Sequence, residues 1–151
     1  PETAVLDWLD PAMVAGHWVP GMVALVGGSY GLAAPGERSR PREWSEIRAH
    51  DPEVLVASPC GFDLDQTVKN IEDLTARQGW SELTAVETGR VYLLDGDQYM
   101  NRPGPRLVDT LELLAGILHP GAEETPDPTD RDGVRQVAEV VDGEPDRGEL
   151  V

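Results

Sequence analysis

The segment from residue 90 to residue 108 reads Arg-Val-Tyr-Leu-Leu-Asp-Gly-Asp-Gln-Tyr-Met-Asn-Arg-Pro-Gly-Pro-Arg-Leu-Val, and it predicts a strand, a loop and a helix start. Residues 91–94 form a short apolar run rich in strand formers, and the Asp-Gly-Asp that follows is typical of a turn. Pro105 suits the first position of a helix, because that position needs no N–H donor. Leucines then recur at helical spacing as far as Leu118.

The chain before this segment alternates in the same way. Apolar runs predict buried strands over residues 3–9 and 53–58. Helices are predicted over residues 17–26, 43–50 and 63–78, and residues 12–16 and 33–42 are predicted as loops. This alternation predicts an α/β fold with three layers, in which a mostly parallel sheet carries helices on both faces.

Composition divides the chain near residue 120. Residues 121–151 hold 10 acidic and 3 basic residues together with several prolines, and such segments rarely bury enough apolar surface to fold. We therefore predict one folded lobe over residues 1–120 and an acidic, proline-containing tail over residues 121–151. Val134, Val137 and Val141 are spaced to form one weak helical stripe that packs back on the lobe.

The chain is strongly acidic. It has 12 Lys+Arg and 28 Asp+Glu, a formal charge of −16, and Lys69 is its one lysine. Nucleic-acid binding is excluded, because phosphate contacts need clustered cations. An acidic chain almost without lysine is typical of a protein kept soluble in multimolar salt, where counterions screen self-repulsion. The alternative is an ordinary acidic protein from an arginine-rich genome.

Few residues offer metal or thiol chemistry. A single cysteine, Cys60, excludes an internal disulfide framework, and the 3 histidines are too far apart for a metal motif. No segment approaches the roughly 20 apolar residues that span a bilayer, and no signal peptide is visible. Because the chain starts at Pro1 without a methionine, we expect it to be a piece of a longer protein.

In an open α/β sheet, ligands bind at the loops that follow the carboxyl ends of the strands. These loops combine aromatic side chains with a few polar groups, as a small-ligand site does. The candidates are Trp8, Trp18, Phe62, Asp97, Tyr99, Asn101 and Arg102. Four of them have a structural alternative: the two tryptophans as core packing, Asp97 as a turn residue and Arg102 as a surface charge. No nucleophile elbow, P-loop or dinucleotide fingerprint is present.

Six short stretches, in this order, resemble the second half of a periplasmic-binding-protein-like family. The family contains the cobalamin-binding and ferric-siderophore-binding components of ABC importers. The stretches are VLDWLDP (5–11), GHWVP (16–20), DPEVLV (51–56), PCGFD (59–63), GRVY (89–92) and NRPGPRLVD (101–109). PCGFD and NRPGPRLVD look most like the branch labelled cobalamin-binding. The resemblance runs from about residue 3 to residue 120.

The resemblance implies a class III substrate-binding protein, in which two α/β lobes joined by one long rigid helix hold the ligand between them. This chain would be the C-terminal lobe, and an N-terminal lobe absent from it would supply the opposing wall. Ligand binding would be non-covalent, so we expect no enzyme, no catalytic residue and no cofactor. We also expect an extracytoplasmic protein at the cell surface, anchored to the membrane through a segment outside this chain, with an ABC permease and its ATPase as partners.

Family positions carry over to particular residues. An aromatic of the first strand–helix loop lines the cleft, and Trp8 and Trp18 are the candidates. An Asp and an Arg of the loop before the last helix match Asp97 and Arg102, although this sequence has an extra residue between them. The position of the acidic residue that meets permease arginines aligns with Ser45, and of the acidic residues beside it, Glu43 and Glu46, we take Glu46 as the docking residue.

The predicted ligand is a corrinoid such as cobalamin, which is flat-faced and ringed by amides. An anionic ferric siderophore would favour several arginines, and here Arg102 is joined at most by the cluster Arg38, Arg40 and Arg42. A ferric siderophore or haem is the alternative within the same family. Two alternatives of another class are a small α/β enzyme that uses Cys60 or His17, and an interaction domain with an acidic docking surface.

Overall fold

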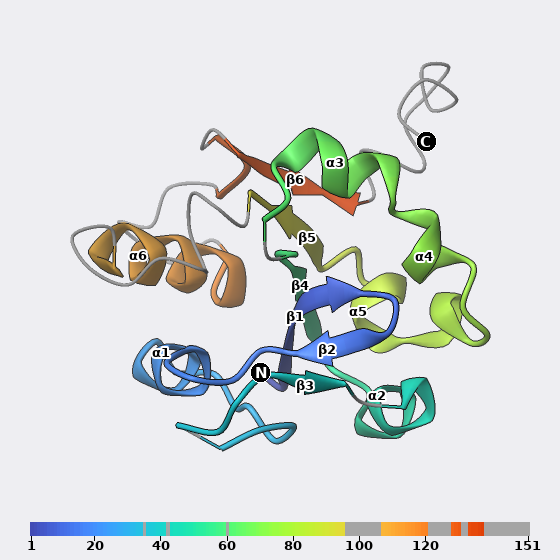
Figure 1. Ribbon diagram of the computed structural model, residues 1–151. Helices are drawn as coiled ribbons and strands as arrows, with labels where there is room; N and C mark the ends of the chain where they lie inside the picture. Colours follow the sequence, from blue (N-terminus) through green and yellow to red (C-terminus); the bar gives the residue numbers. More distant parts are fainter. Residues whose placement is uncertain are drawn as a thin grey trace.

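The computed structural model of the chain describes residues 1–34, 36–41, 43–59, 61–95, 107–120, 128–130 and 133–137. Figure 1 shows one central sheet with helices on either side. The strands are β1 (Thr3–Leu9), β2 (Ala12–Val14), β3 (Arg40–Pro41), β4 (Val54–Ala57), β5 (Val91–Leu94) and β6 (Val134–Gln136). The helices are α1 (Val19–Leu25), α2 (Trp44–His50), α3 (Leu64–Lys69), α4 (Glu72–Thr75), α5 (Thr84–Glu87) and α6 (Leu107–Leu118), with short 3₁₀ turns η1 (Trp80–Glu82) and η2 (Pro128–Asp130).

The strand order in the sheet is β3-β2-β1-β4-β5-β6. Strands β1, β4 and β5 run parallel at the centre, with Leu6 opposite Ala57 and Ala57 opposite Leu93. Strands β2, β3 and β6 are antiparallel to their neighbours. The predicted α/β class with helices on both faces is confirmed, but the parallel part is limited to the centre and the sheet as a whole is mixed.

Alternate residues of the central strands face two different apolar layers, as the two-residue period of a strand requires. Leu6, Leu55 and Leu93 face the layer that contains α2, α3, α4 and α5. Val5 and Val56 face the layer that contains α1 and α6. Figure 1 shows α1 and α6 together on one side of the sheet, with α2 and α5 on the other. The central strands are therefore covered on both faces, which explains their continuous apolar sequence.

Two strands, the edge strand β3 and its neighbour β2, lie in segments that were predicted as loops. Strand β2 occupies residues 12–14 and pairs with β1, and the two-residue strand β3 pairs with β2. Both strands are too short to produce a hydrophobic period of their own. The turn after β1 places β2 beside β1, and the segment at residues 40–41 pairs with β2 in turn, so tertiary pairing overrides the local loop signal.

Strand β6 comes from the segment predicted as an acidic tail. It pairs antiparallel with β5, and Val134 and Val137 are buried. The helical stripe expected over residues 134–141 is therefore wrong for residues 134–136. If these residues were helical, the backbone groups along the edge of β5 would stay unpaired, and pairing with β6 satisfies them. Val141 lies outside the described residues. The division of the chain at residue 120 stays a prediction, with β6 as an addition to the sheet.

Candidate functional site

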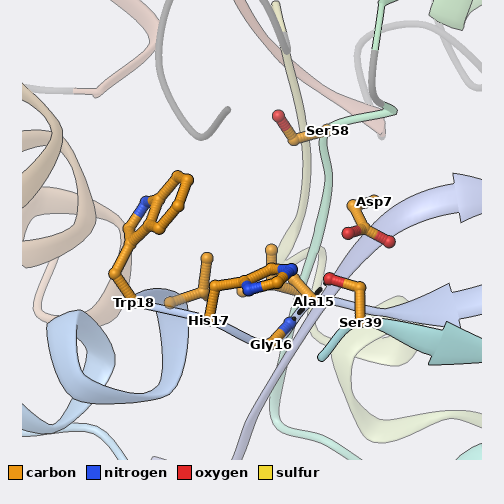
Figure 2. Close-up of a pocket in the computed structure, with 9 residues that line it drawn as sticks. Asp7, Ala15, Gly16, His17, Trp18, Ser39 and Ser58 are labelled. Carbon is orange, nitrogen blue, oxygen red and sulfur yellow. Dashed lines mark hydrogen bonds between the residues drawn. The ribbon is translucent and has the colours of Figure 1, made fainter. Parts of the chain in front are cut away.

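The carboxyl ends of β1 and β4 meet at a small pocket. After β1 the chain turns to the antiparallel strand β2, and after β4 it crosses to α3. The connections that leave these two neighbouring strands therefore diverge, as they do at the ligand-binding position of open α/β sheets. The pocket has a volume of about 40 Å³. It is lined by Val5, Asp7, Ala15, Gly16, His17, Trp18, Val19, Ser39 and Ser58, and Figure 2 shows Asp7 and Ser58 across it from Trp18.

Asp7 reaches the pocket because β1 is irregular at this residue. Leu6 pairs with Val14 and Trp8 pairs with Met13, which leaves Asp7 without an opposite residue on β2. An extra residue of this kind redirects its side chain, and such bulges are common beside binding sites. Asp7 is not among the predicted site residues, although a carboxyl group inside an otherwise apolar strand is a signal that the sequence contains.

The environment of Asp7 is only partly polar. Burial raises the pKa of the Asp7 carboxyl, and a hydrogen bond from the Ser39 hydroxyl and the nearby His17 ring oppose that rise. Within the described part of the chain, the buried Oδ1 atom of Asp7 and the Oγ atom of Ser58 have no hydrogen-bond partner. The Ser58 side chain is 0 % exposed. Buried polar atoms are normally paired, so these two atoms mark the pocket as a place for a polar group.

At the rim of the pocket, the backbone of residues 16–17 lies close against residues 37–39. The Gly16 amide donates to the Ser39 hydroxyl at 2.9 Å, and the His17 amide donates to the carbonyl of Glu37. His17 has a φ of 55°, in the left-handed region that a non-glycine residue adopts at a cost. This conformation places His17 over the pocket and starts α1 with Trp18 as its wall. The centres of the His17 and Trp18 rings are 5.9 Å apart.

Tyr30 forms hydrogen bonds with the backbone of two residues that line the pocket. Its hydroxyl donates to the Ala15 carbonyl at 2.7 Å and lies 3.2 Å from the Val5 carbonyl. Burial raises the pKa of this phenol, so it remains a neutral donor at any ordinary pH. Because Val5 and Ala15 both line the pocket, Tyr30 ties β1 to the segment that follows β2.

A second group of side chains at the same edge is aromatic. The rings of Trp8 and Phe62 meet edge to face, with centres 5.0 Å apart and planes at 62°. The structure therefore brings together two of the predicted aromatics, one from the end of β1 and one from the loop after β4. Trp18 belongs instead to the wall of the pocket. Both half-buried rings, Trp8 and Phe62, leave part of their surface available for a ligand.

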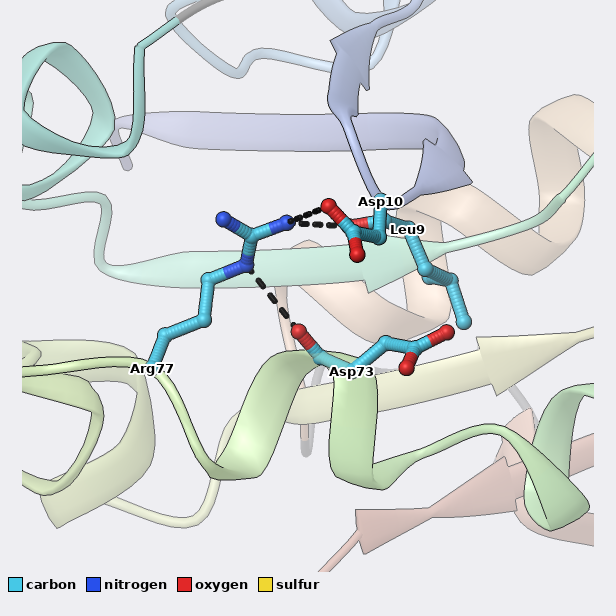
Figure 3. A network of polar contacts seen from close by, with 4 residues as sticks. All are labelled: Leu9, Asp10, Asp73 and Arg77. Carbon is cyan, nitrogen blue, oxygen red and sulfur yellow. Dashed lines mark hydrogen bonds and ion pairs between the residues drawn. The ribbon is translucent and has the colours of Figure 1, made fainter.

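An arginine fixes the end of β1 (Figure 3). Arg77 Nη2 donates to the Leu9 carbonyl at 2.7 Å and lies 3.3 Å from a carboxylate oxygen of Asp10, while Nε donates to the Asp73 carbonyl at 3.0 Å. Its guanidinium also lies 5.3 Å from the centre of the Trp44 ring. The network joins the turn after β1, and with it the end of the strand that carries Trp8, to α4.

The predicted docking residues border a separate groove. Glu43 and Glu46 are exposed at the start of α2, where the Glu43 amide donates to Glu46 Oε1 at 3.4 Å. The groove has a volume of about 360 Å³ and includes Asp10, Trp44 and Arg77. Its lining holds three acidic side chains, Trp44 and one arginine, and this excess of negative charge suits contact with a cationic partner.

Four predicted ligand contacts, Asp97, Tyr99, Asn101 and Arg102, lie outside the described residues and stay predictions. Cys60, the nucleophile of the enzyme alternative, lies outside them as well. In the ranges that the structure does describe, no group of three or more His, Cys, Asp or Glu side chains is arranged to hold a metal ion. Ser39 and Ser58 carried no signal in the sequence, because their role depends on which segments meet at the pocket.

Comparisons with known proteins agree with this architecture, although no family model matches the chain. An uncharacterised ABC transporter substrate-binding lipoprotein of Bacillus subtilis (strain 168), YvrC, is 48 % identical over 74 residues, which are 49 % of this chain and 23 % of that protein. A periplasmic heme binding protein from Pseudomonas aeruginosa superposes with a TM-score of 0.70 at 21 % identity, over 90 % of this chain and 47 % of that one. The periplasmic vitamin B12 binding protein BtuF of Vibrio cholerae gives a TM-score of 0.62 at 24 % identity, over 78 % of this chain and 43 % of that one.

The fold of the chain is that of one lobe of a periplasmic substrate-binding protein, as the resemblance in sequence implies. The chain spans about a quarter of the curated relative and less than half of the two solved structures. These proteins are described as substrate-binding or ligand-binding proteins.

Proposed function

We propose that this chain is the C-terminal lobe of the substrate-binding component of an ABC importer and that it binds a corrinoid. The observation that carries the proposal is the carboxyl edge of β1 and β4, where the Trp8–Phe62 pair lies next to a pocket with a buried carboxyl group. Aromatic edges suit the flat, amide-ringed surface of a corrinoid, which a protein binds without chemical change.

The charge of this edge favours a corrinoid over an anionic ligand. Asp7 is the acidic group of the pocket, and among the described residues that line it none is arginine or lysine. The carboxylates of haem or of a citrate-type siderophore would face Asp7 without a strong cation to pair with. Haem or a ferric chelate remains the second candidate, because a heme binding protein shares this fold.

The proposed place of action is the outside of the membrane. Relatives with this fold are described as periplasmic proteins or as a lipoprotein. Within the described ranges, no helix is both long and apolar enough to cross a bilayer. Delivery of the ligand would require a permease and its ATPase, and anchoring would use a segment outside this chain.

Equilibrium dialysis of the full-length protein that contains this chain tests the proposal. We expect saturable retention of cyanocobalamin and little retention of a ferric siderophore or haem, measured by visible absorbance. The assay is run in low and in multimolar potassium chloride, and we expect retention in high salt only, because counterions must screen a charge of −16. The chain alone, as a control, should bind little. Retention of haem or a siderophore in place of cyanocobalamin would mean that the ligand is that compound and not a corrinoid. Retention of none of them would contradict the proposal.

The acidic groove at α2 is proposed as the contact with the permease. The double variant Glu43→Gln/Glu46→Gln should lower ligand uptake in cells by about tenfold, because two exposed carboxylates that meet permease arginines would be lost. Cyanocobalamin affinity should stay unchanged. Glu72→Gln, an exposed carboxylate on α4, is the matched control and should leave uptake intact. Equal uptake by both variants would rule out this docking surface.

A further inference from the structure

The pocket beside the Trp8–Phe62 pair has a composition that selects between ligand groups. Its apolar wall comes from Val5, Ala15, Val19 and Trp18. Among the described residues, three polar atoms of its lining are buried without a hydrogen-bond partner: Asp7 Oδ1, Ser58 Oγ and Trp18 Nε1, and Ser58 is 0 % exposed. Figure 2 shows Asp7 and Ser58 on one side of the pocket, across from the Trp18 ring.

The three unpaired atoms differ in what they offer. A carboxylate oxygen only accepts hydrogen bonds, an indole N–H only donates, and a serine hydroxyl does both. One polar neighbour of Asp7 is already engaged, because the Ser39 hydroxyl donates to Asp7 and accepts from the Gly16 amide. A group that satisfies all three atoms must therefore donate to Asp7, and it can accept from Ser58 or from the Trp18 indole.

Three kinds of ligand group can be compared on this basis. A carboxylate has no hydrogen to donate and would place a second negative charge beside Asp7. An ammonium group donates, but a full charge is costly to desolvate against a wall that is largely apolar. A primary carboxamide donates through its nitrogen and accepts through its oxygen, and it is neutral. The pocket volume of about 40 Å³ admits a group of this size but not a ring.

We propose that this pocket binds one peripheral carboxamide of the corrinoid, with the amide N–H donating to Asp7 Oδ1 and the Ser58 hydroxyl donating to the amide oxygen. Asp7 is then a specificity-determining residue that rejects ligands with a carboxylate at the same position. The inference rests on the proposed corrinoid function and adds to it the identity of the group that is recognised. The Trp8–Phe62 pair contacts the macrocycle, and the pocket sets its orientation.

The test compares cyanocobalamin with a panel of its monocarboxylic acids, in each of which one peripheral amide has been hydrolysed. Dissociation constants are measured by equilibrium dialysis with the full-length protein. For the native protein, we expect at least one monoacid to bind about tenfold more weakly than cyanocobalamin, because its carboxylate lacks the donor and faces Asp7. Asp7→Asn should remove most of that difference, since an asparagine amide can donate to a carboxylate.

Two further variants make the result specific. Asp65→Asn removes an exposed carboxylate of α3 and should leave the discrimination unchanged, which controls for overall charge. Ser58→Ala should weaken cyanocobalamin binding about fivefold through the lost donor. The melting temperature of each variant shows that the lobe still folds, and Asp7→Asn should melt no lower than the native protein.

The outcomes separate the two proposals. Discrimination that is lost in Asp7→Asn and kept in Asp65→Asn supports the carboxamide site. If cyanocobalamin binds but all monoacids bind equally, or if Asp7→Asn discriminates as the native protein does, the carboxamide site is wrong and the corrinoid function stands. If the native protein binds no corrinoid at all, both proposals are wrong.

Discussion

Gly16→Ala is expected to lower the free energy of unfolding by about 3 kcal/mol, because the added methyl group has no space. A Cβ atom at this position would lie 2.2 Å from the Glu37 carbonyl oxygen and 2.7 Å from the Arg38 carbonyl carbon. Both atoms belong to the backbone, and the loop cannot easily move away, because the His17 amide donates to that same Glu37 oxygen. Urea unfolding followed by tryptophan fluorescence measures the loss.

Gly21→Ala is the matched control for this change. Gly21 lies in α1, and a Cβ atom there would have nothing within 4 Å. Alanine is the better helix former by about 0.8 kcal/mol, so this variant should be slightly more stable than the native chain. If Gly16→Ala unfolds at the same urea concentration as Gly21→Ala, the crossing of residues 16 and 37 that forms the pocket rim is not as the structure shows it.

Arg77→Ala is expected to cost about 2 kcal/mol of stability, since it removes hydrogen bonds from a charged group to the backbone. The guanidinium binds the Leu9 carbonyl at 2.7 Å and the Asp73 carbonyl at 3.0 Å, and its side chain is 21 % exposed. The same variant should weaken cyanocobalamin binding, because Leu9 follows Trp8 at the end of β1. Urea unfolding and dialysis measure the two effects.

Two control variants show whether geometry or charge carries the effect of Arg77. Arg77→Lys keeps the charge but loses the planar fork of donors, so it should lose most of the same stability. Arg48→Ala breaks an exposed ion pair with Glu82 at 3.8 Å, where the side chains are 39 % and 76 % exposed, and should cost about 0.5 kcal/mol or less. A cost for Arg77→Ala no larger than that for Arg48→Ala would mean that the network contributes little.

Elements whose signal is local could be predicted closely from the sequence. The apolar runs of β1, β4 and β5 place these strands within about one residue of the structure. The start of α3 at Asp63, where the helix over residues 63–78 was predicted to begin, is fixed by a capping box: the Gln66 amide donates to Asp63 Oδ1 at 2.9 Å, and the Asp63 amide donates to Gln66 Oε1 at 2.9 Å. Each of these features depends on residues at most a few positions apart, so propensity and pattern suffice to find them.

The candidate site could be predicted in part. Trp8 and Phe62 were selected because they follow strands whose carboxyl ends had to meet, and the structure places their rings 5.0 Å apart. Trp18 was grouped with them, but it lines a different part of the edge. The sequence could not distinguish these two positions, since it does not state the direction in which each side chain leaves the backbone.

Composition and short-range pattern were thus enough for the α/β class, the three central strands and the edge of the sheet that we propose as the ligand site. The pocket was decided by tertiary structure alone. Asp7 turns into it because β2 pairs with β1 out of register, and Ser39 reaches it from 32 positions further along the chain. Pairing of this kind depends on where distant backbones meet, and that depends on the packing of the whole lobe and not on any one segment.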